Sequence, residues 1–217
     1  MTEAIFLSAS VPDPRRGSEY AKTADAVAIQ AAVSALVYIT LGRRLLIWGG
    51  HPAITPMIWV AAADMKIDYA QWVRLYQSRY FEDAFPEDNE RFNNVIFSEN
   101  VEGDREKSLL EMRRKMFGEN QYAAAVFIGG MGGVVDEFNL FRSLQPNASI
   151  VPILSTGGAA LELAKKMDAL PEDLSNNLDY VSLLYRHLDI SEQEDRFFRP
   201  NEQPADPEAR RWKPPTP

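Results

Sequence analysis

Four glycines within five consecutive positions, directly after an unbroken apolar run, constrain the fold of this chain more than any other feature. Residues 123–128 read AAAVFI and predict a buried strand, and residues 134–144 predict a helix. The turn between them consists of Gly129, Gly130, Met131, Gly132 and Gly133. Glycines allow a phosphate to approach the backbone N–H groups, and the positive end of the helix dipole attracts an anion. The segment therefore predicts a strand–turn–helix unit that binds a phosphorylated ligand.

The glycine turn matches neither of two well-known phosphate-binding motifs. In the dinucleotide fingerprint G-x-G-x-x-G, Gly130 and Gly132 fit the first two positions, but Val135 occupies the third. The P-loop pattern is also absent, because no Gly-Lys-Ser/Thr follows the turn. Glycines also serve tight strand-to-helix turns, so a turn without a ligand stays open as an alternative.

Apolar strands and helices alternate along the chain. Strands are predicted at 5–10, 45–48, 73–77, 94–97, 122–128 and 150–154, and helices at 26–41, 54–65, 105–117, 134–144 and 159–167. Nearly continuous apolar strands are typical of a parallel sheet covered on both faces. We therefore expect an α/β fold, a Rossmann-like parallel sheet with helices on both faces, in one domain of residues 1–188. Residues 189–217 are rich in proline and charge and predict a tail that is mobile or draped over the surface.

The composition excludes several kinds of site. There is no cysteine, and the two histidines lie far apart in the sequence, so we expect neither a metal nor a cofactor. A net charge of −8 argues against contact with a nucleic-acid backbone. The longest apolar helix candidate, residues 31–41, is too short to span a bilayer, and the start lacks the basic region of a signal peptide. A cytoplasmic protein without membrane contact is expected.

Small and polar residues gather where the predicted strands end. In open α/β sheets, ligands bind beyond the carboxyl ends of the strands, so these residues are candidates for one ligand site. Besides the glycine turn, the candidates are Ser8, Ser10, Gly49, Gly50, His51, Thr156, Gly157 and Gly158. The segment 77–79 ends at the same edge, and Arg15 and Arg16 lie in a loop above it, where an ordinary exposed turn is an equally good interpretation.

Four charged residues on two predicted helices complete the candidate site. Arg113 and Arg114 point about 100° apart on a helix, so we expect at least one of them to face the ligand. A guanidinium suits a phosphate because it donates two parallel hydrogen bonds, although cations near a helix C-terminus are favourable without any ligand. Asp136 and Glu137 begin the helix after the glycine turn. They offset the helix dipole, hold a ribose hydroxyl, or stabilise positive charge during cleavage of an N-glycosidic bond, and we favour binding.

These motifs resemble those of the SLOG superfamily, which includes Lonely Guy phosphoribohydrolases, SMF DNA-processing proteins and sensor domains of bacterial conflict systems. Residues 128–136, IGGMGGVVD, align without gaps with the Lonely Guy motif P-G-G-x-G-T-x-x-E. Arg114 and Lys115 resemble the basic pair of the preceding M-x-x-R-K helix, which favours Arg114 over Arg113. The resemblance covers residues 4–168 and extends, through residues 6–10, 49–55 and 155–160, to a prokaryotic branch of stand-alone SLOG proteins.

The chain departs from the enzyme motif at three positions. Ile128 replaces the proline, Gly133 replaces the threonine, and Asp136 stands at the catalytic glutamate, with Glu137 one residue later. The resemblance therefore implies a nucleotide-binding sensor or effector module of a bacterial defence system, for which we expect a nucleotide-like ligand. The alternative is a phosphoribohydrolase that cleaves a nucleoside monophosphate, with Arg114, Asp136 and Glu137 as catalytic residues.

Two expectations concern partners. Single-stranded DNA binding, as in the SMF branch, is disfavoured by the acidic charge and by the lack of an aromatic and basic groove. A homo-oligomer, specifically a dimer, is expected from the resemblance and from the helix at residues 54–63, which has more apolar residues than one buried face requires. Burial of both sides of that helix within one subunit is the alternative.

Overall fold

The computed structural model describes residues 3–212, and its core is a six-stranded sheet with strand order β4-β3-β2-β1-β5-β6. The strands are β1 (Ala4–Ser10), β2 (Leu45–Trp48), β3 (Val73–Ser78), β4 (Val95–Ser98), β5 (Tyr122–Gly129) and β6 (Ser149–Ile153). Every neighbouring pair is parallel. The predicted parallel α/β sheet is thereby confirmed, and all strand carboxyl ends share one edge of the sheet.

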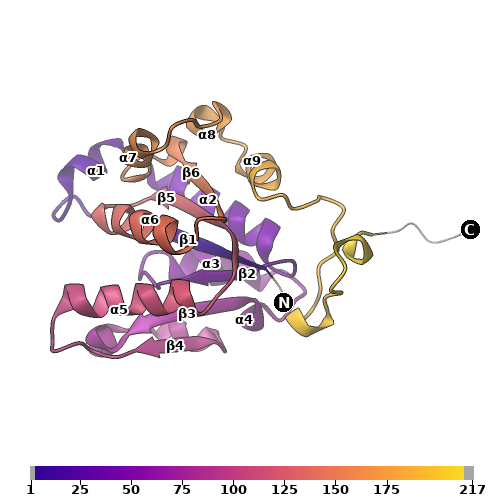
Figure 1. The fold of residues 1–217 in the computed structure, drawn as a ribbon, viewed down its shortest axis with the longest axis horizontal. Helices are drawn as coiled ribbons and strands as arrows, with labels where there is room; N and C mark the ends of the chain where they lie inside the picture. Colours follow the sequence, from indigo (N-terminus) through magenta and orange to yellow (C-terminus); the bar gives the residue numbers. More distant parts are fainter. Residues whose placement is uncertain (1–2, 213–217) are drawn as a thin grey trace, which may run out of the picture.

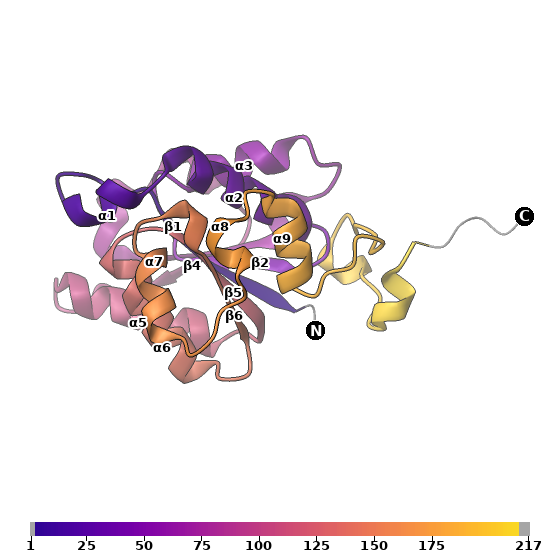
Figure 2. The same ribbon diagram turned by 90° about the horizontal axis from the view of Figure 1, so that it is seen from above.

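Helices cover both faces of the sheet (Figure 1). On one face α2 (Ala26–Thr40) packs against α3 (Thr55–Ala63) and α9 (Tyr180–His187), and on the other α5 (Arg105–Gly118) packs against α6 (Gly132–Leu144). Figure 2 shows α2 and α3 on the side of the sheet away from α5 and α6. The shorter helices are α1 (Ser18–Thr23), α4 (Tyr69–Trp72), α7 (Ala160–Leu163) and α8 (Asp173–Asn176). Two 3-10 helices, η1 (Arg79–Ala84) and η2 (Glu87–Arg91), join β3 to β4, and four more are η3 (Leu154–Thr156), η4 (Ala164–Lys166), η5 (Pro200–Glu202) and η6 (Pro207–Arg210).

An aromatic cluster fixes α5 and α6 against the sheet. Phe6 of β1 is fully buried, with its ring 4.8 Å from that of Phe117 in α5 and 5.5 Å from that of Phe141 in α6. Aromatic pairs of this kind contribute about 0.5–1.5 kcal/mol beyond the area they bury. The cluster therefore anchors the last turns of both helices against β1.

The short helices are where the structure differs from the sequence-based expectation. The helix expected at 159–167 is split into α7 and η4, and α1, α4, α8 and α9 were not expected. In α9, the side chain of Asp179 caps the helix by accepting a hydrogen bond from the N–H of Ser182. Such elements have too few residues for a clear helical period. Packing decides them instead, with α9 against α2 and α8 against β6 and η3.

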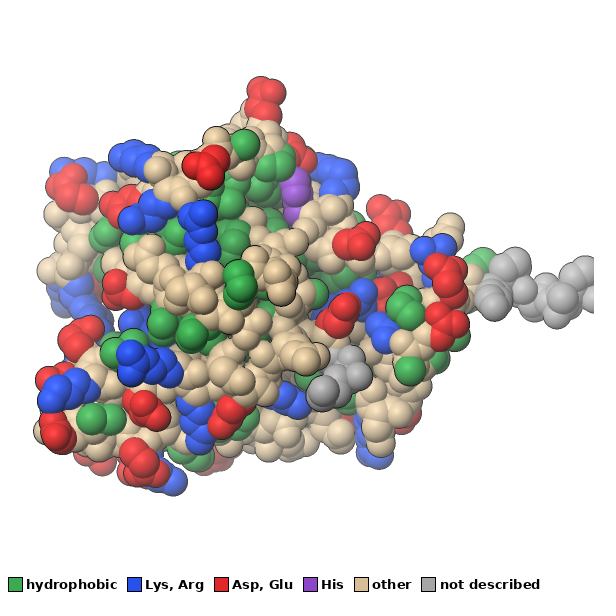
Figure 3. All heavy atoms as spheres, in the orientation of Figure 1, with side chains coloured by type: hydrophobic (Ala, Val, Ile, Leu, Met, Phe, Trp, Pro, Cys, Tyr) green, Lys and Arg blue, Asp and Glu red, His purple; other side chains and the backbone are tan. Residues whose placement is uncertain are grey.

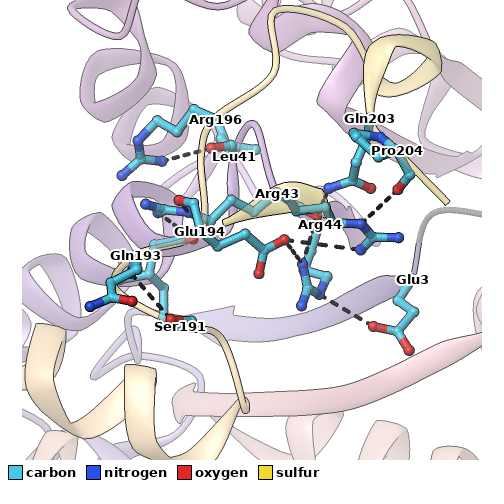
Figure 4. Close-up of polar contacts among 12 residues, drawn as sticks. Glu3, Leu41, Arg43, Arg44, Ser191, Gln193, Glu194, Arg196, Gln203 and Pro204 are labelled. Carbon is cyan, nitrogen blue, oxygen red and sulfur yellow. Dashed lines mark hydrogen bonds and ion pairs between the residues drawn. The ribbon is translucent and has the colours of Figure 1, made fainter. Parts of the chain in front are cut away.

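Residues 189–212 lie beside the N-terminal edge of the sheet, with Glu194 at the centre of their contacts (Figure 4). The Glu194 side chain is 7% exposed, and its Oε1 lies 2.6 Å from Nη1 of Arg44 and 4.0 Å from Nη1 of Arg210. The backbone oxygen of Glu194 accepts a bond of 2.7 Å from Nε of Arg43. All three arginines are buried, and backbone carbonyls accept many of their N–H groups.

The backbone adds further bonds between this segment and the sheet domain. The N–H of Phe197 donates to the oxygen of Gly42 at 2.9 Å, and the indole N–H of Trp72 donates to the oxygens of Phe197 and Phe198 at 3.2 Å each. The segment is therefore attached by backbone bonds and by a buried ionic cluster.

Two kinds of feature are absent from the part of the chain that the structure describes. Between residues 3 and 212, no helix combines the length and apolar character needed to cross a bilayer. In the same range, no three His, Asp or Glu side chains gather in a way that could hold a metal ion.

Candidate functional site

A cavity of about 540 Å³ opens at the carboxyl edge of the sheet. Its walls include Ser10 at the end of β1, Gly49 and His51 after β2, Gln77 at the end of β3, and Gly132 at the start of α6. Small-molecule sites typically have volumes of roughly 300–1,000 Å³. The strand order reverses between β1 and β5, and ligands of open α/β sheets bind next to such a reversal. The cavity therefore has the size and the position of a ligand site.

The turn after β5 is held in a fixed shape by its neighbours. Gly129 and Gly130 have φ angles of 58° and 83°, in the left-handed region that favours glycine. The N–H of Gly130 donates to the oxygen of Ser10 at 2.8 Å, and the N–H of Gly129 donates to Oγ1 of Thr156 at 2.8 Å. A side chain at Gly158 would meet the oxygen of Gly130 at 2.7 Å. The contacts with Ser10, Thr156 and Gly158 therefore fix the backbone conformation of the turn.

The start of α6 presents free donors to the cavity. Gly132 and Gly133 both line it, and their N–H groups donate to no other described residue. The first N–H groups of a helix have no partner within the helix, and the helix dipole adds partial positive charge there. A Cβ added at Gly132 would meet nothing within 4 Å. The space in front of these donors is therefore open to a ligand.

Arg113 and Glu137 form an ion pair in the cavity wall. Nε of Arg113 lies 3.3 Å from Oε1 of Glu137, and Nη2 of Arg113 donates to the oxygen of Gly133 at 3.3 Å. The hydroxyl of Ser8 donates to Oε2 of Glu137 at 2.6 Å. This pairing places one guanidinium and one carboxylate beside the free donors of α6, each held by a second partner.

In each pair of charged candidates, one residue lines the cavity and the other does not. Arg113 is buried and lines the cavity, whereas Arg114, which the sequence comparison favoured, is exposed and does not line it. Glu137 lines the cavity, whereas the Asp136 side chain is 60% exposed and lies 3.8 Å from Nη1 of Arg113. Neighbouring helix positions point about 100° apart, which is why only one residue of each pair faces inward.

The candidate residues from the sequence fall into two groups. Those that line the cavity are Ser10, Gly49, Gly50, His51, Arg113, Met131, Gly132, Gly133 and Glu137. Those that lie outside its lining are Ser8, Gly129, Gly130, Arg114, Asp136, Thr156, Gly157 and Gly158. Of the second group, Ser8 contacts Glu137 directly. The strand ends after β1, β2 and β3 thus meet the start of α6 in one cavity, while the turn after β6 lies behind it.

Sequence reasoning overlooked the aromatic part of the wall. Phe81 and Phe85 come from η1 and the residue after it, and Leu109 and Met112 come from α5. The segment 79–86, RYFEDAFP, has neither a helical nor a strand period, so no element was expected there. The available signal was a pair of aromatic residues in a polar loop directly after a strand end.

His51 is a neutral hydrogen-bond donor. The N–H of Ala53 donates to Nδ1 of His51 at 3.2 Å, so the ring proton lies on Nε2. Burial, and then the positive charge of Arg16, lower the pKa of His51 below its ordinary value of 6.5. The imidazole therefore offers a directed N–H to a ligand near neutral pH.

We expect NMR titration to give His51 a pKa below 6.5, with a His187→Gln variant assigning the two histidine signals. Below about 6.5, the unfolded chain then binds more protons at this site than the folded protein does. The free energy of unfolding therefore falls as the pH decreases through that window, and a His51→Asn variant lacks this component. A His51 pKa at or above 6.5 would contradict the assignment.

Together, the parallel sheet, the glycine turn and the cavity at the carboxyl edge define a Rossmann-like α/β protein. Residues 19–188 match the model of the SLOG cluster3 family. Because the match covers more than half of the chain, the protein belongs to this family, and the expected SLOG membership is confirmed. Among curated proteins, none matches the chain. Residues 189–217 lie outside the family match.

Proposed function

We propose that the cavity binds a nucleotide or a nucleotide-derived small molecule, with a phosphate at the start of α6. The observation that carries this proposal is the pair of free N–H groups at Gly132 and Gly133, with the Arg113 guanidinium beside them. Backbone donors at a helix N-terminus and an adjacent arginine complement a phosphate in both charge and geometry. Membership of the SLOG cluster3 family supports the same class of ligand.

We further propose that the protein is a sensor or effector module in a bacterial defence or conflict system. In this role, ligand occupancy is the signal and turnover is not required. The departures from the enzyme motif at Ile128, Gly133 and Asp136 support this choice. A phosphoribohydrolase is the second candidate, because Glu137 lines the cavity and is oriented by Ser8 and Arg113.

Two measurements on the purified protein test these proposals. Native mass spectrometry is expected to show a retained nucleotide, or calorimetry to show binding of at least one nucleoside monophosphate. Incubation with nucleoside monophosphates, followed by chromatography, is expected to release no free base. Base release by the wild type but not by a Glu137→Gln variant would establish the phosphoribohydrolase instead. Absence of any nucleotide binding would refute both candidates.

Replacing Arg113 by alanine is expected to weaken nucleotide binding roughly ten- to a hundredfold. The change removes charge-assisted hydrogen bonds worth about 1.5–3 kcal/mol to a phosphate. Arg114→Ala is the matched control, since Arg114 is adjacent but exposed, and we expect its affinity to stay within about twofold of wild type. Calorimetry measures the nucleotide affinity of both variants. Equal losses of affinity would show that Arg113 does not contact the phosphate.

We also propose that the protein is a homodimer that pairs through α2 and α3. Residues 26–41 and 54–63 contain no charged side chain, and Val27 and Val60 are 76% and 56% exposed. By contrast, acidic and basic side chains are interspersed over the α5 side of the molecule (Figure 3). Interface cores are depleted of charge, and a second copy with a net charge of −8 is repelled least by an uncharged surface.

Light scattering is expected to give a dimer for the wild type at micromolar concentration. A Val60→Asp variant is expected to be monomeric, because the interface would bury an unpaired carboxylate. Leu144→Asp, at an exposed leucine on α6, is the control and should remain dimeric. A monomeric wild type, or a dimeric Val60→Asp protein, would contradict this arrangement.

A further inference from the structure

We propose that the end of the cavity formed by β3, η1 and α5 is the subsite for the base of the nucleotide, and that Gln77 recognises the edge of that base. This inference rests on the proposed nucleotide function and adds the orientation of the ligand. The cavity lining runs from the start of α6, which follows β5, past the ends of β1 and β2 to the end of β3. Three strand spacings of roughly 4.8 Å place the end of β3 about 14 Å from the glycine turn. A ligand with its phosphate at α6 therefore extends along the strand ends toward β3.

Gln77 presents to the cavity a carboxamide that the protein itself leaves largely unpaired. Its side chain lines the cavity, and the residue is only 7% exposed. Within residues 3–212, its sole hydrogen bond is a long one of 3.5 Å, from Nε2 to the oxygen of Gly49, and its Oε1 has no partner. The amide donors and the carbonyl acceptor are therefore available to a ligand in the cavity that pairs with them.

The absence of a side chain at Gly50 leaves room for the Gln77 side chain in this position. A Cβ at Gly50 would lie 1.6 Å from Nε2 of Gln77, and Gly50 has a φ of 68°. Any other residue there would displace the carboxamide. The glycine after β2 therefore makes room for an amide that faces the cavity, which is a different role from that of the glycines after β5.

Aromatic and apolar side chains surround this end of the cavity. Phe81 and Phe85 line it and are only partly buried, and Leu109 and Met112 of α5 line it as well. The ring of Phe85 stacks on that of Phe97 at 5.6 Å with an interplanar angle of 29°, which supports it from behind. A planar base covers such a surface by stacking, while its polar edge needs a donor and an acceptor such as those of Gln77.

The experiment compares ligands that differ only in the base. Calorimetry measures the affinities of AMP, GMP, CMP, UMP and ribose 5-phosphate for the full-length protein. At least one nucleotide is expected to bind at least tenfold more tightly than ribose 5-phosphate, since stacking of a base on aromatic side chains is worth about tenfold or more. We define the base advantage as the affinity for that nucleotide divided by the affinity for ribose 5-phosphate.

Gln77→Ala and Phe85→Ala are each expected to reduce the base advantage roughly tenfold, while the affinity for ribose 5-phosphate stays within about twofold. Gln121→Ala and Phe198→Ala, at exposed residues outside the cavity lining, are the matched controls. Thermal unfolding verifies that each variant is folded, and a Gln77→Glu variant provides a second probe with nearly unchanged volume.

The outcomes separate this inference from the proposed function. If the wild type binds ribose 5-phosphate as tightly as every nucleotide, the base subsite is wrong while phosphate binding stands. The subsite is also wrong if neither cavity variant changes the base advantage. If the wild type binds none of the five ligands, the proposed function fails and the base subsite fails with it.

Discussion

Replacing Gly132 by leucine is expected to abolish nucleotide binding while leaving the fold intact. Gly132 lines the cavity at the first position of α6, and a Cβ there meets no protein atom within 4 Å. The leucine side chain would therefore occupy the space in front of the free N–H groups, where the phosphate is proposed to lie. We expect affinity to fall by roughly a hundredfold or more, which corresponds to about 2.8 kcal/mol. Stability should change by no more than about 1 kcal/mol, since leucine has the better helix propensity.

Gly118→Leu is the control for this prediction. Gly118 also lies in a helix, and a Cβ there also meets nothing within 4 Å, but it does not line the cavity. Binding is measured by calorimetry with the nucleotide that the wild type binds most tightly, and stability by thermal unfolding. If the Gly132→Leu protein binds the nucleotide with wild-type affinity, the phosphate does not bind at the start of α6. A Gly130 variant is unsuitable for this test, since a Cβ there would approach Val134 to 2.2 Å and damage the turn itself.

Replacing Glu194 by alanine is expected to lower the free energy of unfolding by about 3–5 kcal/mol. Its carboxylate pairs with Arg44, which also lies 3.3 Å from the exposed Glu3, and it lies within 4.0 Å of Arg210. Glu194, Arg44 and Arg210 are all buried. Removing it leaves two buried guanidinium groups with less compensating charge, which costs more than the ion pair contributes when intact. Total stability of a protein this size is about 5–15 kcal/mol, so the loss is large.

Glu192→Ala, at an exposed glutamate two residues away, is the matched control and should stay within about 0.5 kcal/mol of wild type. Urea unfolding followed by tryptophan fluorescence gives both values, and hydrogen exchange shows whether residues 189–212 lose protection in the Glu194 variant. If Glu194→Ala unfolds at the same urea concentration as Glu192→Ala, the buried cluster adds no stability.

The strands of this fold were predictable because buried strands are encoded as short runs of apolar residues. The central strands β1, β2 and β5 are apolar runs with nearly every side chain buried. Each observed strand boundary lies within a residue of the expected one. The long helices were predictable for a similar reason, since each spans several turns with a repeating apolar face. The contacts of residues 189–212 were not predictable, because a cluster such as that of Arg44 and Glu194 joins residues 150 positions apart.

The candidate site was only partly accessible from the sequence. Small residues after the strands identified the edge of the sheet, because ligands of open α/β sheets generally bind beyond the carboxyl ends of the strands. The choice between Arg113 and Arg114 was not accessible, since it depends on the rotation of α5 about its axis, which packing of Met112 and Met116 in the core determines. The wall formed by Phe81 and Phe85 was also hidden, because 3-10 segments lack a period.

The central position of β1 has a consequence for how the chain reaches its native state during synthesis. β1 is made before the other strands of this sheet, yet one of its two neighbours is β5, where Ala4 pairs with Tyr122. Until residues 122–129 leave the ribosome, β1 has an unpaired edge whose N–H and C=O groups can pair with other chains. The contacts of Glu194 form later still. We therefore expect nascent chains to be vulnerable to aggregation through the middle of the future sheet during this interval.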